Sequence, residues 1–119
     1  MKHKEQYCKD LLKKVIKDLE EWRGYESFYD RKAPFEALFH KDKESLFDGS
    51  IIKNCWVVYA KVPKDGWKGG NIIINIDDDT GKALTYVNTA LGGRPRTLPL
   101  IINEEGKYRI DPDYLPTAD

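Results

Sequence analysis

Apolar residues recur every three or four positions between residues 4 and 23, and charged residues fill the positions between them. This spacing places the apolar side chains on one stripe of a helix, with lysines and carboxylates on the opposite side. The stripe consists of Tyr7, Cys8, Leu11, Leu12, Val15, Ile16, Leu19 and Trp22. Gly24 follows it and supplies the left-handed residue that often ends a helix. We therefore expect a long N-terminal helix whose apolar stripe packs on another layer.

The period changes to two in the second half of the chain, where β-branched and aromatic residues alternate with polar ones. The predicted strands are residues 55–62, 71–77, 82–88, 98–103 and 107–111. Asp78, Asp79, Thr80 and Gly81 have the chemistry of a turn closed by a left-handed glycine, and the run that ends at Gly106 repeats it. Two such hairpins predict antiparallel pairing, with Ile72, Ile74 and Ile76 beneath the helix.

The region between these two patterns is harder to assign. Pro34 suits the first turn of a helix, and the sequence PFEALFHKDKESL predicts a second, short helix there. Phe35, Leu38, Phe39 and Leu46 would then be mostly core residues. The C-terminal residues 112–119 contain two prolines and predict an extended tail.

Together these elements predict one domain that spans residues 1–119. The predicted fold class is α+β, with a long N-terminal helix packed on one face of an antiparallel sheet, because helices and strands are segregated along the chain. A chain of 119 residues has the usual length of a single domain.

Charge and cysteine usage exclude several classes of protein. Lysine plus arginine and aspartate plus glutamate balance at 20 each, so we expect no nucleic-acid or membrane partner. The distribution is uneven, since residues 1–17 carry six lysines against two carboxylates (+4) and residues 103–119 carry two cations against five carboxylates (−3). These ends are either solvated surfaces or partner surfaces. With no signal-peptide pattern and no long apolar run, we expect a cytoplasmic protein in which Cys8 and Cys55 are buried free thiols.

No catalytic or metal-binding template fits the sequence. The histidines belong to no cysteine–histidine spacing motif, and Gly81 falls where a calcium loop needs a ligand. No serine lies in a nucleophile elbow. His40 with Asp42 or Glu44 forms an acid–base pair only if the fold buries it in a pocket. We therefore predict no enzyme activity, no metal and no cofactor.

The strand and turn residues between residues 34 and 91 follow a pattern that is found in a known protein family. The sequence has Trp56-Val57-Val58-Tyr59, then Val62-Pro63, Gly69-Gly70 and the hairpin that ends in Thr80-Gly81-Lys82. In this pattern the chain resembles the NTF2-fold immunity proteins that accompany bacterial polymorphic toxins. The resemblance implies a cystatin/NTF2-like cone, with a helix cradled by a curved sheet. It also implies function by occlusion of a cognate toxin domain, without catalysis.

The leading interpretation is an immunity protein that binds and neutralises this toxin as a monomer or homodimer. Exposed tryptophan and arginine are typical of interface hot spots. The candidate partner-binding residues are Trp67, Lys68, Arg94 and Arg96, with Asp77, Asp78 and Asp79 as the acidic contribution. The alternative is a small NTF2-like pocket enzyme or ligand-binding protein that uses His40, Tyr59 and Tyr86. A third possibility is a structural subunit that dimerises through the outer sheet face.

Overall fold

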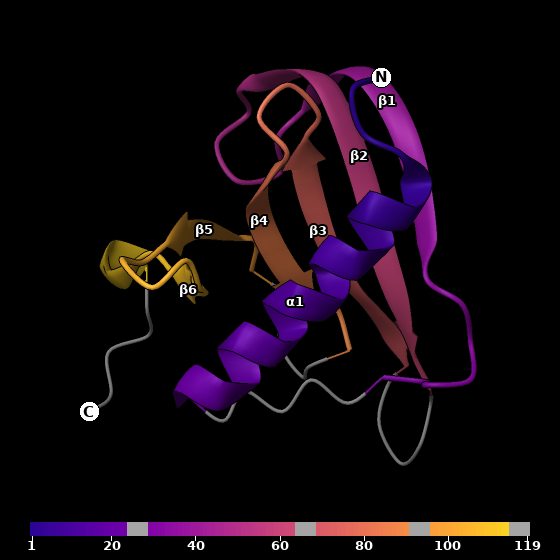
Figure 1. Cartoon of the computed structure of the whole chain (residues 1–119), viewed down its shortest axis with the longest axis vertical. Coiled ribbons are helices and arrows are strands. Elements are labelled where there is room, and N and C mark those ends of the chain that lie inside the picture. The colour runs from indigo at the N-terminus through magenta and orange to yellow at the C-terminus, as the bar shows by residue number, and fades with distance from the viewer. Residues whose placement is uncertain (24–28, 64–68, 91–95, 115–119) are drawn as a thin grey trace.

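The computed structural model describes residues 1–23, 29–63, 69–90 and 96–114. One N-terminal helix, α1 (Glu5–Arg23), precedes a six-stranded antiparallel sheet that is not closed (Figure 1). The strands are β1 (Glu36–Glu44), β2 (Ile51–Val62), β3 (Gly70–Asp77), β4 (Lys82–Asn88), β5 (Leu98–Ile102) and β6 (Tyr108–Ile110). The α+β class and the long N-terminal helix predicted from the sequence are confirmed.

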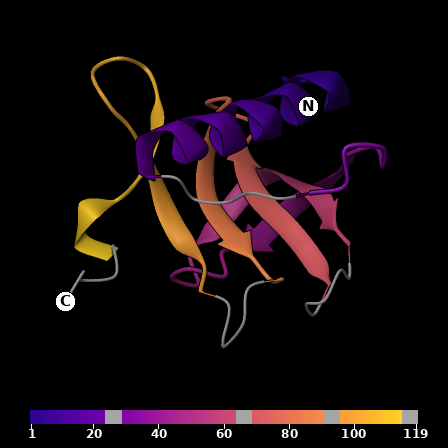
Figure 2. The ribbon, with the colours of Figure 1, turned by 90° about the horizontal axis from the view of Figure 1, so that it is seen from below.

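The apolar stripe of α1 forms the helical side of the core. The helix runs diagonally across one face of the sheet and contacts β1, β2 and β6 (Figure 2). Its buried residues are Cys8, Leu11, Leu12, Val15, Ile16 and Leu19. They pack on inward-facing strand residues that include Trp56, Val58, Ala60, Ile72, Ile74 and Ile76. The predicted inner face of β3 is therefore correct.

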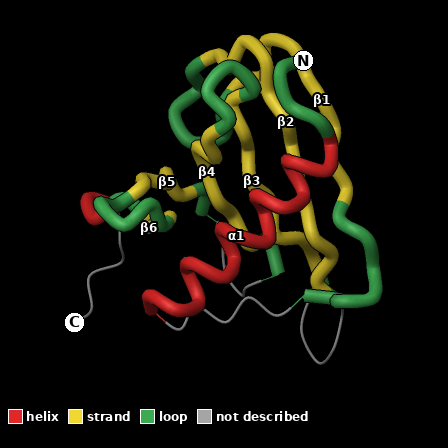
Figure 3. The backbone as a smooth tube through the Cα atoms, viewed as in Figure 1, coloured by secondary structure: helices red, strands yellow, loops and turns green. Residues whose placement is uncertain are grey.

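The sheet is a meander, because its spatial order follows the chain order from β1 to β6. Gly81 and Gly106 close the predicted hairpin turns with φ angles of 75° and 77°. The register between β3 and β4 shifts between Asn75 and Ile76, where an irregularity interrupts the ladder. Such bulges bend a strand and increase its twist. Figure 3 shows the β1–β2 and β3–β4 turns at the end of the sheet where the N-terminus lies.

The predicted second helix is wrong, since its sequence forms β1 and pairs with β2. Glutamate, alanine, leucine and lysine favour a helix locally. Tertiary pairing overrides this preference, because Ala37 and Phe39 lie opposite Val58 and Trp56 and join the core that these residues form. Leu38, on the other face of the strand, is 49% exposed.

The C-terminal end of the described chain also differs from the prediction. Pro112–Tyr114 forms one turn of 3-10 helix (η1) in place of an extended tail, and residues 115–119 lie outside the described residues. The ring centroid of Tyr114 lies 4.9 Å from that of Phe47, in the β1–β2 turn. Leu46 in the same turn is 70% exposed, so it is not the core residue expected from the sequence.

The two edges of the sheet differ in whether α1 covers them. β6 forms one edge, and α1 covers it through Asp18, which is only 5% exposed. The Asp18 carboxylate accepts a hydrogen bond from the backbone N–H of Tyr108 at 3.0 Å and one from the Lys14 ammonium at 2.7 Å. Arg109 donates to the Asp18 carbonyl oxygen at 3.1 Å. These hydrogen bonds explain why the Asp18 carboxylate can be buried.

We expect Asp18→Ala to lower the free energy of unfolding by about 2 kcal/mol, because the buried N–H of Tyr108 loses its acceptor. Urea denaturation followed by circular dichroism measures the change. Asp10→Ala is the control, since Asp10 is exposed on the same helix and accepts only from Gln6. Equal unfolding midpoints for the two variants would show that water replaces Asp18 at this edge.

Candidate functional site

The three aspartates of the β3–β4 hairpin differ in exposure. Asp79 is exposed and Asp77 is half-buried, whereas Asp78 is only 1% exposed. Asp77 and Asp79 remain accessible to a partner. Asp78 does not present its carboxylate at the surface, contrary to the expectation from the sequence.

The Asp78 carboxylate holds the N-terminal segment of the chain against the sheet. It accepts hydrogen bonds from the backbone N–H groups of Lys2 and His3, the latter at 2.9 Å, and from Nε1 of Trp56 at 3.1 Å. Burial raises the pKa of this carboxyl, but these hydrogen bonds outweigh it and hold the pKa below its usual value. Asp78 therefore has a structural role.

His3 and Tyr7 complete this contact at the hairpin turn. Nδ1 of His3 lies 2.9 Å from the carbonyl oxygen of Asp78, which only accepts, so Nδ1 carries the hydrogen. The Tyr7 hydroxyl donates to the carbonyl of Gly81 at 2.6 Å. A Cβ at Gly81 would lie 2.7 Å from the His3 ring, so glycine is required by packing as well as by its φ angle.

Of the other predicted partner-binding residues, only Arg96 is described, and it lies at the opposite end of the sheet. Trp67, Lys68 and Arg94 lie outside the described residues, and Arg96 is exposed. At this end Val62 pairs with Gly70. β3 has eight residues, so this end is roughly 25 Å from the aspartates at about 3.3 Å per residue. The structure therefore places Arg96 away from the acidic candidates.

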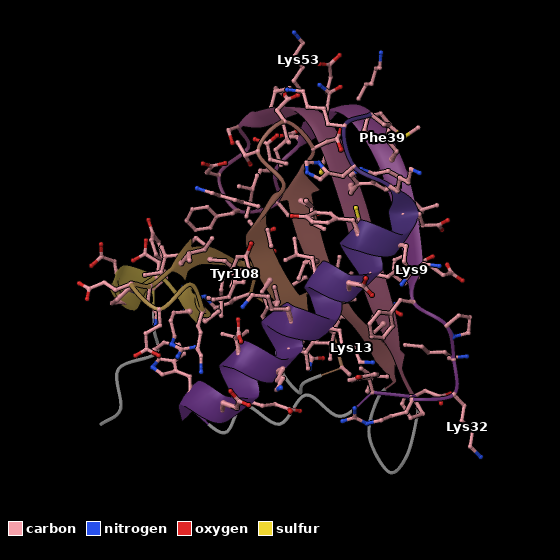
Figure 4. All side chains as sticks on the ribbon, viewed as in Figure 1. Lys9, Lys13, Lys32, Phe39, Lys53 and Tyr108 are labelled. Carbon is pink, nitrogen blue, oxygen red and sulfur yellow. The ribbon has the colours of Figure 1, made fainter. Side chains whose placement is uncertain are left out.

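A different concave surface lies between α1 and the chain that leads into β1. This groove, which we call the basic groove, has a volume of about 490 Å³ and is open to solvent. Its lining residues are Gln6, Lys9, Asp10 and Lys13 of α1 and Tyr29, Arg31, Ala33, Pro34 and Phe35 of the incoming chain. Figure 4 shows Lys9 and Lys13 on the side of α1 that faces this chain.

Aromatic residues form the apolar part of the basic groove. Tyr29 is 5% exposed, and its ring centroid lies 5.4 Å from that of Phe35. The guanidinium of Arg31 lies over the Tyr29 ring at 4.5 Å and donates to its hydroxyl at 3.0 Å. Stacking of this kind orders the arginine side chain while its outer face remains available.

The charge of the basic groove is not balanced internally. Its lining carries three cations and one carboxylate, which gives a net charge of +2. Lys9 forms an ion pair with Glu5 at 3.5 Å. Within the described residues, no carboxylate forms an ion pair with Lys13 or Arg31. Lys13 and the stacked Arg31, beside an aromatic floor, can bind carboxylate groups.

Sequence reasoning found only part of this groove. The excess of lysine in residues 1–17 was visible, and Lys9 and Lys13 stand one helical turn apart. Tyr29 and Arg31 were missed, because nothing local shows that their segment folds back beside α1.

The residues of the alternative pocket hypothesis do not converge. His40 is exposed on β1, and Tyr59 lies on the outer face of the sheet, where its hydroxyl bonds Glu36. Tyr86 is 6% exposed and belongs to the core on the inner face. These positions do not form one reaction site.

The cysteines are also unsuited to catalysis. Both are buried free thiols. Burial raises the pKa of Cys8 to about 12, with a further contribution from the charge of Asp78, and burial raises the pKa of Cys55 to about 11. Neither forms a thiolate near neutral pH.

In the described parts of the chain, no group of three or more histidine, cysteine, aspartate or glutamate side chains is arranged to hold a metal ion. No helix among the described residues is long and apolar enough to cross a membrane. No family model, curated protein or solved structure matches this chain. The features that bear on function are therefore the geometry of the basic groove and the residue pattern of the sequence.

Proposed function

We propose that this protein acts by binding another protein, as an immunity protein that neutralises a cognate bacterial toxin by occluding it. The observation that carries the proposal is the basic groove, where Lys13 and Arg31 lie beside Tyr29 and Phe35 without ion pairs to the described carboxylates. Tyrosine and arginine are enriched at the energetic centres of protein interfaces, and complementary charge accelerates association.

The arrangement of the fold supports the same proposal. The helix followed by an antiparallel meander is the order that a cystatin/NTF2-like fold requires, and we assign the chain to that fold as part of the proposal. The strand and turn residues that resemble NTF2-fold immunity proteins lie in β2, β3 and the β3–β4 hairpin. Binding by a rigid surface needs no catalytic group, which agrees with the separation of His40, Tyr59 and Tyr86.

The partner surface should be acidic where it meets the basic groove. A net charge of +2 over an aromatic floor selects a segment with two or more carboxylates. Arg96 remains a candidate for a second contact at the far end of the sheet, and Trp67, Lys68 and Arg94 remain candidates from the sequence. Asp77 and Asp79 remain candidates at the hairpin end.

The proposal is tested with the toxin domain encoded beside this protein's gene. We expect a stable complex in a pulldown of purified proteins, and we expect co-expression of this chain to restore growth of cells that produce the toxin domain. The control is a toxin domain from an unrelated system, against which the chain should give no protection. A chain that binds neither domain and does not restore growth would refute the proposed function.

A further inference from the structure

The edge of the sheet opposite β6 is open. β1 pairs with β2 and with no other described strand. In an antiparallel edge strand, the N–H and C=O groups of every second residue point away from the sheet and remain available for hydrogen bonding. At the other edge, the backbone N–H of Tyr108 donates a hydrogen bond to the Asp18 carboxylate. One edge of this sheet is therefore closed by the fold, and the other can accept a strand.

Only the first half of β1 is suited to such an addition. Asp42 has a φ of 53°, a conformation outside the strand region, and it interrupts the regular edge. Lys41 and Lys43 flank it, and charged residues are common devices that protect an edge strand from pairing. Residues 36–40 lie before this interruption and include the half-exposed Leu38.

The basic groove leads directly onto this half of the edge. Ala33, Pro34 and Phe35 line the groove, and the next residue begins β1. A strand added beside residues 36–40 would therefore have one end next to Lys13 and Arg31. The positive charge at this end complements a segment that carries carboxylates there.

A second copy of the chain fits this edge less well. In a symmetric antiparallel pairing of two β1 strands, full overlap places Glu36 opposite Glu44. A shift by two residues places either Glu36 opposite Asp42 or Lys41 opposite Lys41. Pairing confined to residues 36–40 places Leu38 opposite Leu38, and Lys41 of the second copy then follows at the end next to Lys13 and Arg31. Like charges directly opposite one another destabilise a sheet. The charges therefore favour a segment of a different protein.

We propose that an acidic, extended segment of the partner protein adds to the sheet as an antiparallel strand beside residues 36–40 of β1, with carboxylates at its C-terminal end bound in the basic groove. This inference rests on the proposed function and specifies how the partner is held. Main-chain hydrogen bonds supply affinity in such additions, and side chains at alternate positions supply specificity.

The test uses a fluorescent synthetic peptide of alternating threonine and valine that ends in three acidic residues. We expect it to bind the full chain, and we expect Lys13→Glu to weaken binding at least tenfold. We expect the sequence-reversed peptide, which places the acidic residues at the N-terminal end, to bind at least tenfold more weakly.

Two further peptides carry N-methyl groups on alternate backbone nitrogens, in opposite phases. Only one phase faces β1, so one of these peptides should bind at least tenfold more weakly and the other within about threefold of the parent. Amide hydrogen exchange of residues 36–40 should slow when the parent binds.

The other results each overturn the inference. If both methylated peptides bind as tightly as the parent peptide, charge alone holds the segment. If both bind more weakly than the parent by the same factor, the segment does not add as a strand at the sheet edge. Absence of binding by the parent peptide, or unchanged exchange in residues 36–40, would also refute strand addition. The proposed function is judged separately by the pulldown and the growth assay, so either idea can fail while the other stands.

Discussion

Asp78→Ala is expected to lower the free energy of unfolding by about 3 kcal/mol, because it leaves one buried and two part-buried hydrogen-bond donors without their charged acceptor. The affected donors are the N–H groups of Lys2 and His3 and the indole N–H of Trp56. A domain of this size has a total stability of roughly 5–15 kcal/mol, so the loss is a large fraction of the whole. Urea denaturation measures it, and faster amide exchange in the first turn of α1 should accompany it.

Asp79→Ala is the matched control, since this neighbouring carboxylate is exposed and its contacts among the described residues are with the side chains of Asn54 and Lys2. We expect a change below about 0.5 kcal/mol for this variant. A loss for Asp78→Ala no larger than that of the control would show that the N-terminal segment does not depend on Asp78.

The contribution of Asp78 should also depend on pH. Its folded pKa lies below the ordinary value of 3.8, so the native state favours the ionised form. The stabilisation is therefore fully present above that value and is lost as the pH falls through the folded pKa. The stability difference between the wild type and Asp78→Asn should be constant near neutral pH and should narrow below about pH 4.

Local signals predicted the helix and the hairpins because their causes are local. The apolar stripe of α1 repeats within one element, and Gly81 and Gly106 are required by the turns in which they stand. β1 was missed because its stabilising contacts are not local. The strand joins the sheet through the pairing of Ala37 and Phe39 with residues of β2, and its own composition favours a helix.

The difference between local and long-range contacts also explains which parts of the candidate site could be predicted from the sequence. The exposed turn predicted for the hairpin aspartates is correct for Asp79, but Asp78 is buried by residues that are 22 and 75 positions away, Trp56 and His3. The basic groove likewise places Tyr29 and Arg31 beside α1, and no periodicity in the sequence specifies this placement. Local pattern therefore identified the positive helix face but not the surface opposite it.

Reversal of two charges in the basic groove should have the largest effect on partner binding. We expect the double variant Lys13→Glu and Arg31→Glu to weaken binding of the toxin domain about 100-fold, because two attractive charges become repulsive at a complementary surface. The loss should be largest at low ionic strength, since salt screens charges separated by more than about 8–10 Å. Titration calorimetry at two salt concentrations measures both effects, and circular dichroism verifies that the variant is folded.

The matched control is Lys17→Glu with Lys32→Glu, which changes the net charge by the same amount on the same two segments. Both lysines are exposed and neither lines the basic groove, and Figure 4 shows Lys32 directed away from the molecule. We expect a loss of less than about tenfold for this control, since only long-range attraction changes. Equal losses in the two double variants would mean that net charge, and not the basic groove, determines the affinity. In that case the binding surface would have to be sought at the ends of the sheet, near Arg96 or near Asp77 and Asp79.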